Sequence, residues 1–303
     1  MGLLRDILNL HLVLGTLSKA TPLLLAALGG VWSERAGVIN FALEGMMLTG
    51  AFAAVWGSYV TGSPWVGVGC AVVAGLALAA VHGLASLHLR VNQIVSAMAL
   101  NILALGATGS LMECVFGTVG TSPSVAKLPS LPLAEGRVGV LSIVAVVAAI
   151  GSGLLLYRTR WGLAVRAVGE DPTAALTVGA RVFRLKWACV LASGVLAGLA
   201  GAHISTGDLS QFLEGMTGGR GYIAVAAVIF GRWRPGGVML ACFLFGLADA
   251  LGENLQGVGI ARWHISPEWA LMVPFLVTVA ALAGLVGRSV APRGLGETPS
   301  GEG

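Results

Sequence analysis

Two polar side chains lie four residues apart in the otherwise apolar stretch VINFALEGMM of this 303-residue chain. They are Asn40 and Glu44, and on a helix residues at this spacing share a face. An ionisable group inside an apolar span is costly, which makes it a candidate for function. Together an amide and a carboxylate could bind a hydroxyl-rich solute. The structural alternative is that Glu44 pairs with Arg35 or caps a broken helix.

A second polar group occurs in VNQIVSAMALN, where Asn92, Gln93 and Asn101 interrupt an apolar run. These side chains either line a path through the protein or hydrogen-bond to neighbouring helices. A substrate pathway would then be lined by Asn40, Glu44, Asn92, Gln93 and Asn101. The histidines and the four scattered cysteines show no metal or catalytic spacing. We therefore expect no catalytic residue, no metal and no cofactor.

The chain also lacks a phosphate-binding loop of the Gly-Lys-Ser/Thr kind. Its three lysines follow a serine, an alanine and a leucine, as Ser18-Lys19, Ala126-Lys127 and Leu185-Lys186. Any energy from ATP must then come from another chain.

The composition of the chain indicates the environment and fold class in which these residues lie. The chain is 56% hydrophobic and 11% charged, with a mean hydropathy of +0.87. Soluble domains carry about a quarter charged residues, so this is the composition of a membrane protein. We predict an all-α, polytopic bundle of about 8–10 transmembrane helices. Nine apolar segments would form it, near residues 11–31, 38–56, 65–89, 93–116, 138–157, 187–206, 221–231, 236–252 and 268–287.

The cations lie in short loops between these segments, where they act as topology signals rather than as a nucleic-acid surface. The loop 158–186 holds six of them against Glu170 and Asp171, a net charge of +4 that equals the charge of the whole chain. Cationic and nearly balanced loops alternate along the sequence. This alternation predicts that loop 158–186 and the C-terminus are cytoplasmic, and nine crossings would place the N-terminus outside.

The sequence contains a short motif that occurs twice. LEGM occurs at 43–46 and again at 213–216, each time after a similar stretch, LLLAALGG (23–30) or GVLAGLAG (194–201). This repetition either arises by chance or marks an inverted structural repeat of the kind common in transporters. In the second copy, segment 221–231 is too short to cross a bilayer alone, and it either crosses as half of a broken helix or re-enters.

The middle of the cationic loop has its own pattern. EDPTAALTVGA offers Asp171 as an N-cap, a proline at the first helical position and Gly179 as a stop. The short helix between them would present small side chains at Ala174 and Ala175. The loop is either an anchor for anionic lipid headgroups or a site for a cytoplasmic partner, and the start and stop signals favour a partner.

Three blocks of this sequence resemble one family. GEDPTAALTVGARV resembles the coupling loop of permease subunits of ATP-binding-cassette (ABC) importers. PLLLAALGGVWSERAGVINFALEGMMLTGAFAAV (22–55) and GRGYIAVAAVIFGRWRPGG (219–237) are similar to nucleoside and simple-sugar permeases. That group is related to the branched-chain amino-acid and ribose permeases. The resemblance covers nearly the whole chain in order.

The resemblance implies a multi-pass subunit of a prokaryotic cell membrane that imports a nucleoside or simple sugar. It further implies a cytoplasmic ATP-binding subunit, a second permease subunit or second copy, and an extracytoplasmic substrate-binding lipoprotein. Residues 1–290 would form one permease domain, and 291–303 a disordered cytoplasmic tail. Contact with the ATPase would involve Arg166, Glu170, Asp171, Ala174, Ala175 and Gly179.

Two alternatives remain open. One is a branched-chain amino-acid permease. The other is a self-sufficient secondary transporter, which would need paired charges inside the membrane for a coupling ion.

Overall fold

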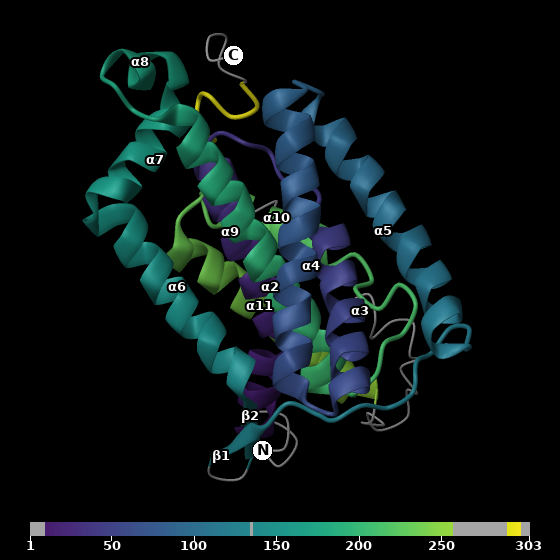
Figure 1. Ribbon diagram of the computed structural model, residues 1–303. Coiled ribbons are helices and arrows are strands. Elements are labelled where there is room, and N and C mark those ends of the chain that lie inside the picture. Colours follow the sequence, from purple (N-terminus) through teal and green to yellow (C-terminus); the bar gives the residue numbers. More distant parts are fainter. Residues whose placement is uncertain (1–9, 134–135, 257–289, 298–303) are drawn as a thin grey trace.

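The computed structural model describes residues 10–133, 136–256 and 290–297. Its helices form a bundle with one small hairpin, and the long helices run side by side (Figure 1). The elements are α2 (Leu10–Arg35), α3 (Leu43–Thr61), α4 (Pro64–Gly83), η1 (Leu84–His88), α5 (Gln93–Phe116), β1 (Ser130–Leu133), β2 (Gly136–Gly139), α6 (Val140–Arg158), α7 (Arg160–Glu170), α8 (Pro172–Thr177), α9 (Val182–Ala202), η2 (His203–Leu209), α10 (Arg220–Phe230) and α11 (Pro235–Gln256).

The predicted all-α membrane bundle is confirmed. Each of the first eight apolar segments coincides with a helix, while the ninth, 268–287, lies outside the described residues. Among the described residues, six helical stretches are long and apolar enough to span a bilayer: Leu12–Arg35, Pro64–His88, Gln93–Phe116, Val140–Arg158, Val182–Leu209 and Pro235–Glu253. Helix α10, with 11 residues, is too short to do so alone.

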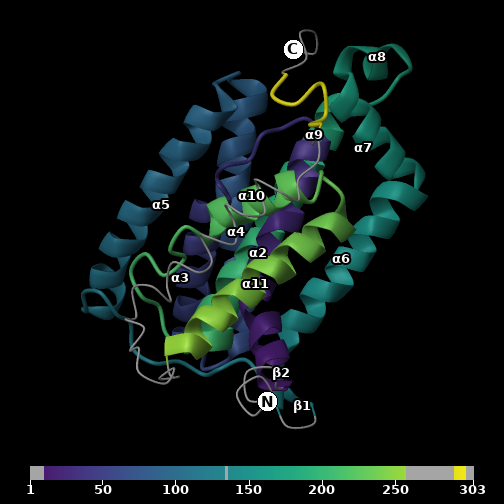
Figure 2. The same cartoon turned by 180° about the vertical axis from the view of Figure 1, so that it is seen from behind.

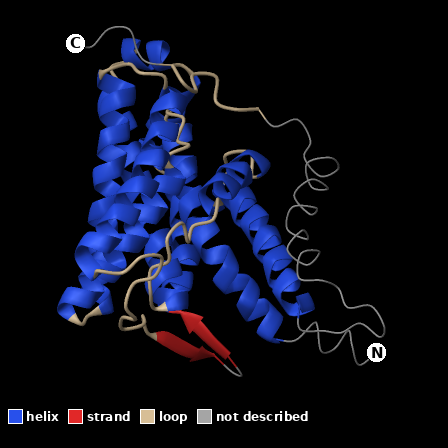
Figure 3. Cartoon of the chain, turned by 90° about the vertical axis from the view of Figure 1, so that its right-hand side faces the viewer, coloured by secondary structure: helices blue, strands red, loops and turns tan. Residues whose placement is uncertain are grey.

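The bundle has two distinct ends. Helices α7 and α8 lie at one end together with residues 290–297, and the β1–β2 hairpin projects at the other (Figures 1, 2 and 3). In the antiparallel hairpin, Leu131 pairs with Val138. We refer to these ends as the coupling-loop end and the hairpin end.

Glycine makes the closest helix contacts possible. A methyl group added at Gly75 of α4 would lie 2.2 Å from the carbonyl oxygen of Gly194 in α9. One added at Gly198 would lie 2.3 Å from the carbonyl oxygen of Ala71. Backbones this close leave no room for side chains, which is how small residues drive association in lipid.

The central pair, α2 and α9, is antiparallel. Ser18 contacts His203 near the hairpin end, and Gly29 approaches Ser193 farther along. Toward the coupling-loop end, Gly37 just after α2 approaches Lys186 of α9.

Each central helix carries one antiparallel partner. Helix α4 packs on α9, with Ala71 near Gly198 and Gly83 near Trp187. Helix α11 packs on α2 in the same sense, with Gly246 near Ala20. Exchanging α2 with α9 and α4 with α11 reproduces this arrangement, which is what an inverted repeat predicts. The first LEGM starts α3 and the second shortly precedes α10, so these helices correspond as well.

The tail differs from its prediction. Residues 291–297 are folded against the coupling-loop end, so the expected disorder is wrong for them, and 298–303 lie outside the described residues. The shortest hydrogen bonds to the segment are Gly294 N to Gly169 O (2.9 Å), Gly296 N to Gly37 O (3.1 Å) and Lys186 Nζ to Glu297 O (2.6 Å). Glycine permits this fit because Gly294 packs backbone to backbone and Gly296 has a φ of +87°.

Candidate functional site

Asn40 lies in a turn and not on a helix. Helix α2 ends at Arg35, Gly37 has a φ of +83°, and α3 begins only at Leu43. The Asn40 amide donates to Ser193 Oγ of α9 (2.7 Å), and its oxygen accepts from Ala42 N (3.1 Å). Asn40 is fully buried. The prediction that it shares a helical face with Glu44 is therefore wrong, because α3 begins three residues after Asn40.

Glu44 caps a second helix. One carboxylate oxygen accepts from Thr217 Oγ1 (2.6 Å) and Gly219 N (2.8 Å), and the other accepts from Gly221 N (2.6 Å). These donors form the entry to α10, where free N–H groups and the helix dipole favour a negative charge. Of the two structural alternatives, capping of a broken helix is thus what the structure shows.

The second alternative, a pair between Glu44 and Arg35, is not formed. Arg35 lies instead 3.9 Å from Glu170 and donates to Trp233 O (2.8 Å).

Asn101 of α5 joins the same region. Its oxygen accepts from Gly45 N (2.9 Å), and its amide donates to Phe41 O (2.9 Å) and to the Tyr222 hydroxyl (3.0 Å). Between α3, α5 and α10 lies a cavity of about 360 Å³, which we call the Glu44 cavity. It is lined by Glu44, Gly45, Leu48, Asn101, Ile102, Leu105, Gly215, Thr217, Gly218 and Tyr222.

The other two predicted pathway residues lie elsewhere. Asn92 caps α5 by accepting from Ile94 N and Val95 N. Gln93 accepts from Ile39 N (2.7 Å) and donates to Gly296 O (3.4 Å). The structure therefore brings only Glu44 and Asn101 of the five into one cavity, and Asn40 is buried outside its lining.

Thr217 and Tyr222 complete the polar lining and were not singled out from the sequence. A signal for them exists in the run GMTGGRGY, because Gly215, Gly218 and Gly219 have φ values of +66°, +54° and +84°. A glycine-rich turn before a short apolar segment indicates an interrupted helix.

The arrangement suits a neutral polar solute. Helices α3 and α10 both begin beside the Glu44 cavity, so the positive ends of both helix dipoles face its carboxylate. Interrupted helices that begin inside a bundle are how transporters form substrate sites. The Tyr222 side chain is 40% exposed, so its hydroxyl can be reached. Among the described lining residues there is no lysine or arginine.

At the coupling-loop end the short helix is where the sequence predicts it. Asp171 accepts from Thr173 N (3.0 Å), Ala174 N (2.9 Å) and the Thr173 hydroxyl (2.6 Å). Hydrogen bonding to the Ala174 N–H, followed by the Thr173 hydroxyl, lowers the pKa of Asp171. Helix α8 then runs over Pro172–Thr177, and Gly179 ends the turn at a φ of +81°.

The two small residues of α8 face opposite ways. Ala175 is 4% exposed and packs with Val168 and Val182, so the prediction that it faces a partner is wrong. Burying its methyl group is what seats this one-turn helix on α7 and α9. Ala174 is exposed, and beside it Val178 is 83% exposed, which leaves a small apolar face uncovered.

Arg166 and Glu170 make contacts within the chain. The Arg166 guanidinium lies 4.8 Å from the centre of the Tyr157 ring. Besides its contact with Arg35, Glu170 accepts from Arg293 N (3.4 Å). These residues connect α7 to α6, α2 and the tail.

Comparison with known proteins adds to this geometry. Residues 12–282 match the family described as "Branched-chain amino acid transport system / permease component". The chain is 36% identical to the guanosine ABC transporter permease protein NupQ of Bacillus subtilis, over 94% of this chain and 95% of that protein. It is 38% identical to the putative glucose ABC transporter permease protein TsgC13 of Haloferax volcanii, over 92% of each chain. With the nucleoside ABC transporter permease protein NupC of Lactococcus lactis the identity is 34%, over 93% and 94%.

Proposed function

The chain belongs to the family of branched-chain amino acid transport system permease components, and on that premise we propose that it imports a nucleoside or a simple sugar. It is a multi-pass protein of a prokaryotic cell membrane. Its role in this proposal is that of the membrane-spanning subunit of an ABC importer, in which a separate subunit hydrolyses ATP.

The Glu44 cavity is the observation that carries the choice of solute. Its polar side chains are those of Glu44, Asn101, Thr217 and Tyr222, which suit the hydroxyl groups of a ribose or a hexose. An amino acid would bring a carboxylate next to Glu44, with no lysine or arginine among the described lining residues to pair with it. This argues against the branched-chain alternative, and the names of the guanosine, nucleoside and glucose relatives argue the same way.

The coupling-loop end faces the cytoplasm in this proposal, because the six cations of loop 158–186 are there. The ATP-binding subunit docks on the exposed face of α8, around Ala174 and Val178. A second permease subunit or second copy completes the membrane unit, and a binding lipoprotein delivers the solute from outside.

A chain of contacts can transmit a displacement of α8 to the Glu44 cavity. Glu170, directly before α8, contacts Arg35 at the end of α2. From there the turn 36–42 carries Asn40, and α3 with Glu44 follows at once. Displacement of α8 by the ATPase would thus reach the N-termini that border the cavity, and alternating access follows from that link.

Uptake of radiolabelled guanosine, glucose and leucine into proteoliposomes tests the proposal. Liposomes holding this chain, its ATPase and its second permease subunit should take up guanosine or glucose only with ATP and the binding protein. Leucine should not be taken up. Removing the Tyr222 hydroxyl (Tyr222→Phe) should raise the KM for uptake about two- to tenfold, the usual range for one lost hydrogen bond.

The secondary-transporter alternative makes the opposite prediction. Ion-gradient-driven accumulation by this chain alone would overturn the proposal, and ATP-dependent uptake of leucine alone would restore the branched-chain alternative.

A further inference from the structure

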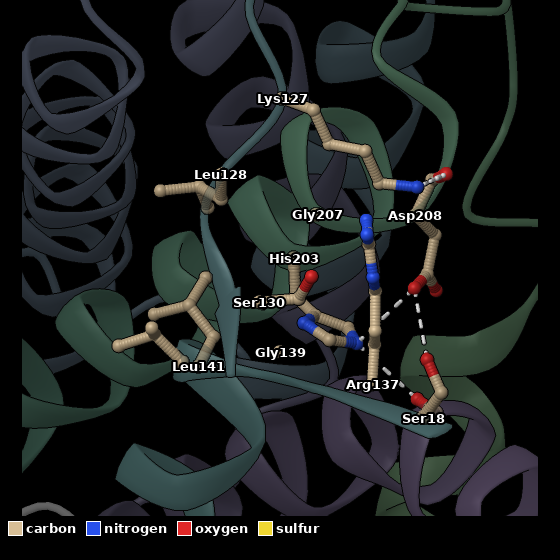
Figure 4. A pocket seen from close by; sticks show the side chains of 11 residues that line it. Ser18, Lys127, Leu128, Ser130, Arg137, Gly139, Leu141, His203, Gly207 and Asp208 are labelled. Carbon is tan, nitrogen blue, oxygen red and sulfur yellow. Dashed lines mark hydrogen bonds and ion pairs between the residues drawn. The ribbon is translucent and has the colours of Figure 1, made fainter. Parts of the chain in front are cut away.

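A second cavity, of about 250 Å³, lies at the hairpin end, between the β1–β2 hairpin, the start of α2 and the end of α9 (Figure 4). None of its residues lines the Glu44 cavity. Its lining consists of Ser18, Lys127, Leu128, Ser130, Arg137, Gly139, Val140, Leu141, His203, Gly207 and Asp208.

Two cations meet one carboxylate there. The Lys127 ammonium donates to the backbone oxygen of Asp208 (2.9 Å), which leaves its charge uncompensated by that bond. Within the part of the chain that the structure describes, the Arg137 guanidinium has no hydrogen-bond or ion-pair partner. Figure 4 shows it extending from β2 past His203, with the ends of Lys127 and Asp208 together on one side of it. The lining therefore carries an excess of positive charge and a free planar donor group.

The Asp208 carboxylate is already in use. It accepts from the Ser18 hydroxyl (2.9 Å) and lies 3.6 Å from His203 Nε2. Both contacts use the same oxygen, Oδ1, and no ion pair joins Asp208 to Arg137 or Lys127 within the part of the chain that the structure describes.

His203 lies deeper, with only 2% of its surface exposed. Its Nε2 faces two acceptors, Ser18 O (3.3 Å) and the Asp208 carboxylate, so this nitrogen carries the proton. The other nitrogen, Nδ1, is then an acceptor, and among the described residues nothing donates to it. Two glycines of the lining lie beside this nitrogen: a methyl group added at Gly207 would lie 3.1 Å from Nδ1, and one added at Gly139 would lie 4.0 Å from it. A buried acceptor without a partner is costly, so a ligand hydroxyl would gain by donating to it.

We propose that this cavity binds a small carboxylate that also carries a hydroxyl group. The carboxylate pairs with Arg137 and Lys127, for which the fork of a guanidinium is well shaped. The hydroxyl donates to His203 Nδ1. Because Arg137 belongs to β2 and His203 to η2 after α9, the bound ligand ties the hairpin to the end of α9. The proposal depends on neither the transported solute nor the ATPase.

Lactate and propionate form a matched pair of probes, since they differ only by the hydroxyl. The purified full-length chain in detergent is titrated with each at constant ionic strength, and binding is followed by isothermal calorimetry and by the rise in the unfolding temperature Tm. Lactate should bind and raise Tm, and propionate should bind about tenfold more weakly because it leaves Nδ1 unpaired.

Variants at the two cations test the carboxylate contact without disturbing the buried histidine. Arg137→Gln and Lys127→Gln should each weaken lactate binding about tenfold, and the double variant should abolish it. Arg160→Gln, an exposed cation at the opposite end, serves as the control and should bind lactate normally.

Three results would overturn the proposal. They are the absence of lactate binding, equal binding of lactate and propionate, and unchanged lactate binding in the double variant. If lactate fails to bind but Arg137→Gln lowers transport driven by the binding protein, the cations instead meet an acidic side chain of that protein, and the small-molecule site is wrong. Failure of guanosine or glucose uptake would leave these titrations unaffected, so the two proposals fail separately.

Discussion

Glu44 shows how one side chain can be structural and reachable at once. Three donors from the α10 entry occupy its two oxygens, yet its side chain is only partly buried and lines the cavity. A carboxylate suits this place because it accepts at both oxygens and meets the positive end of the helix dipole.

Glu44→Gln should destabilise the α10 entry. An amide has one acceptor oxygen, so its NH₂ group must face a donor such as Gly221 N, and a buried donor left unpaired costs about 1–3 kcal/mol. We expect a lower Tm in detergent together with reduced uptake. The sequence offers a matched control in Glu214→Gln, at the same position of the second LEGM and exposed to solvent. Equal Tm values for the two variants would mean that Glu44 does not hold α10.

Part of this site follows from the sequence and part does not. Glu44 and Asn101 were identifiable because polar groups in apolar runs are conspicuous. Thr217 and Tyr222 were not, since Thr and Tyr are ordinary in such runs and only the fold of the glycine-rich turn brings them to Glu44. Asn92 and Gln93 look equally polar in sequence, but one satisfies a helix start and the other a turn.

At the scale of elements, the short helix α8 separates into an inner and an outer face. We expect Ala175→Trp to unseat α8, because overpacking the cluster with Val168 and Val182 costs about 1–3 kcal/mol. The exposed Ala174 allows the docking face to be tested without that damage.

Ala174→Trp should leave the Tm unchanged and reduce co-purification of the ATPase by about tenfold or more, through overpacking of a close contact. Arg181→Ala is the charge control, because it removes an exposed cation and leaves Ala174 unchanged. Normal ATPase recovery with Ala174→Trp would show that the exposed face of α8 is not the docking face.

Helix contacts give a second prediction at this scale. Gly75→Ala should lower the Tm, because its methyl group would collide with the Gly194 carbonyl, and the helices must separate at a cost of about 1–3 kcal/mol. Gly69→Ala lies on the same helix with nothing within 4 Å of the added methyl group. This control should have an unchanged or slightly raised Tm. If both variants melt alike, close backbone contact does not stabilise the α4–α9 pair.

Helix positions were predictable where apolar length alone determines them, as for α5, whose bounds agree at both ends. Helix boundaries were less predictable where a glycine determines the backbone conformation. The predicted segment 38–56 includes most of the turn 36–42, whereas α3 begins only at Leu43, after the positive φ at Gly37. The tail was predicted to be disordered, yet Gly294 packs against Gly169 and Pro172, a contact that exists only once the bundle has assembled.

At the scale of the whole molecule, the two halves meet along α2 and α9. Each end of that helix pair has a different functional feature. The hairpin end has the cationic cavity beside Ser18 and His203. The coupling-loop end has α8, and residues 291–297 lie against it. The Glu44 cavity lies between them, where α3 and α10 begin, so a shift at either end of the central pair can reach it.

The tail provides the most direct test of that arrangement. It touches the coupling loop through Gly169, the turn before Asn40 through Gly37, and the start of α5 through Gln93. A side chain at Gly294 would lie 2.8 Å from Pro172 Cδ, at the first residue of α8. Gly294→Val should therefore displace the tail from α8. We expect the ATPase still to co-purify, because the exposed face of α8 is unchanged, while solute uptake per ATP hydrolysed falls severalfold.

Arg293→Ala is the matched control for this variant. It is the neighbouring residue, its side chain is exposed, and its contact with Glu170 uses only the backbone N–H, which alanine keeps. It should couple ATP hydrolysis to uptake normally. If Gly294→Val is equally well coupled, the tail merely covers the coupling-loop end, and the signal from α8 must pass through Glu170 and Arg35 alone. If both variants uncouple, the exposed guanidinium itself contributes, since that is the only group the control removes.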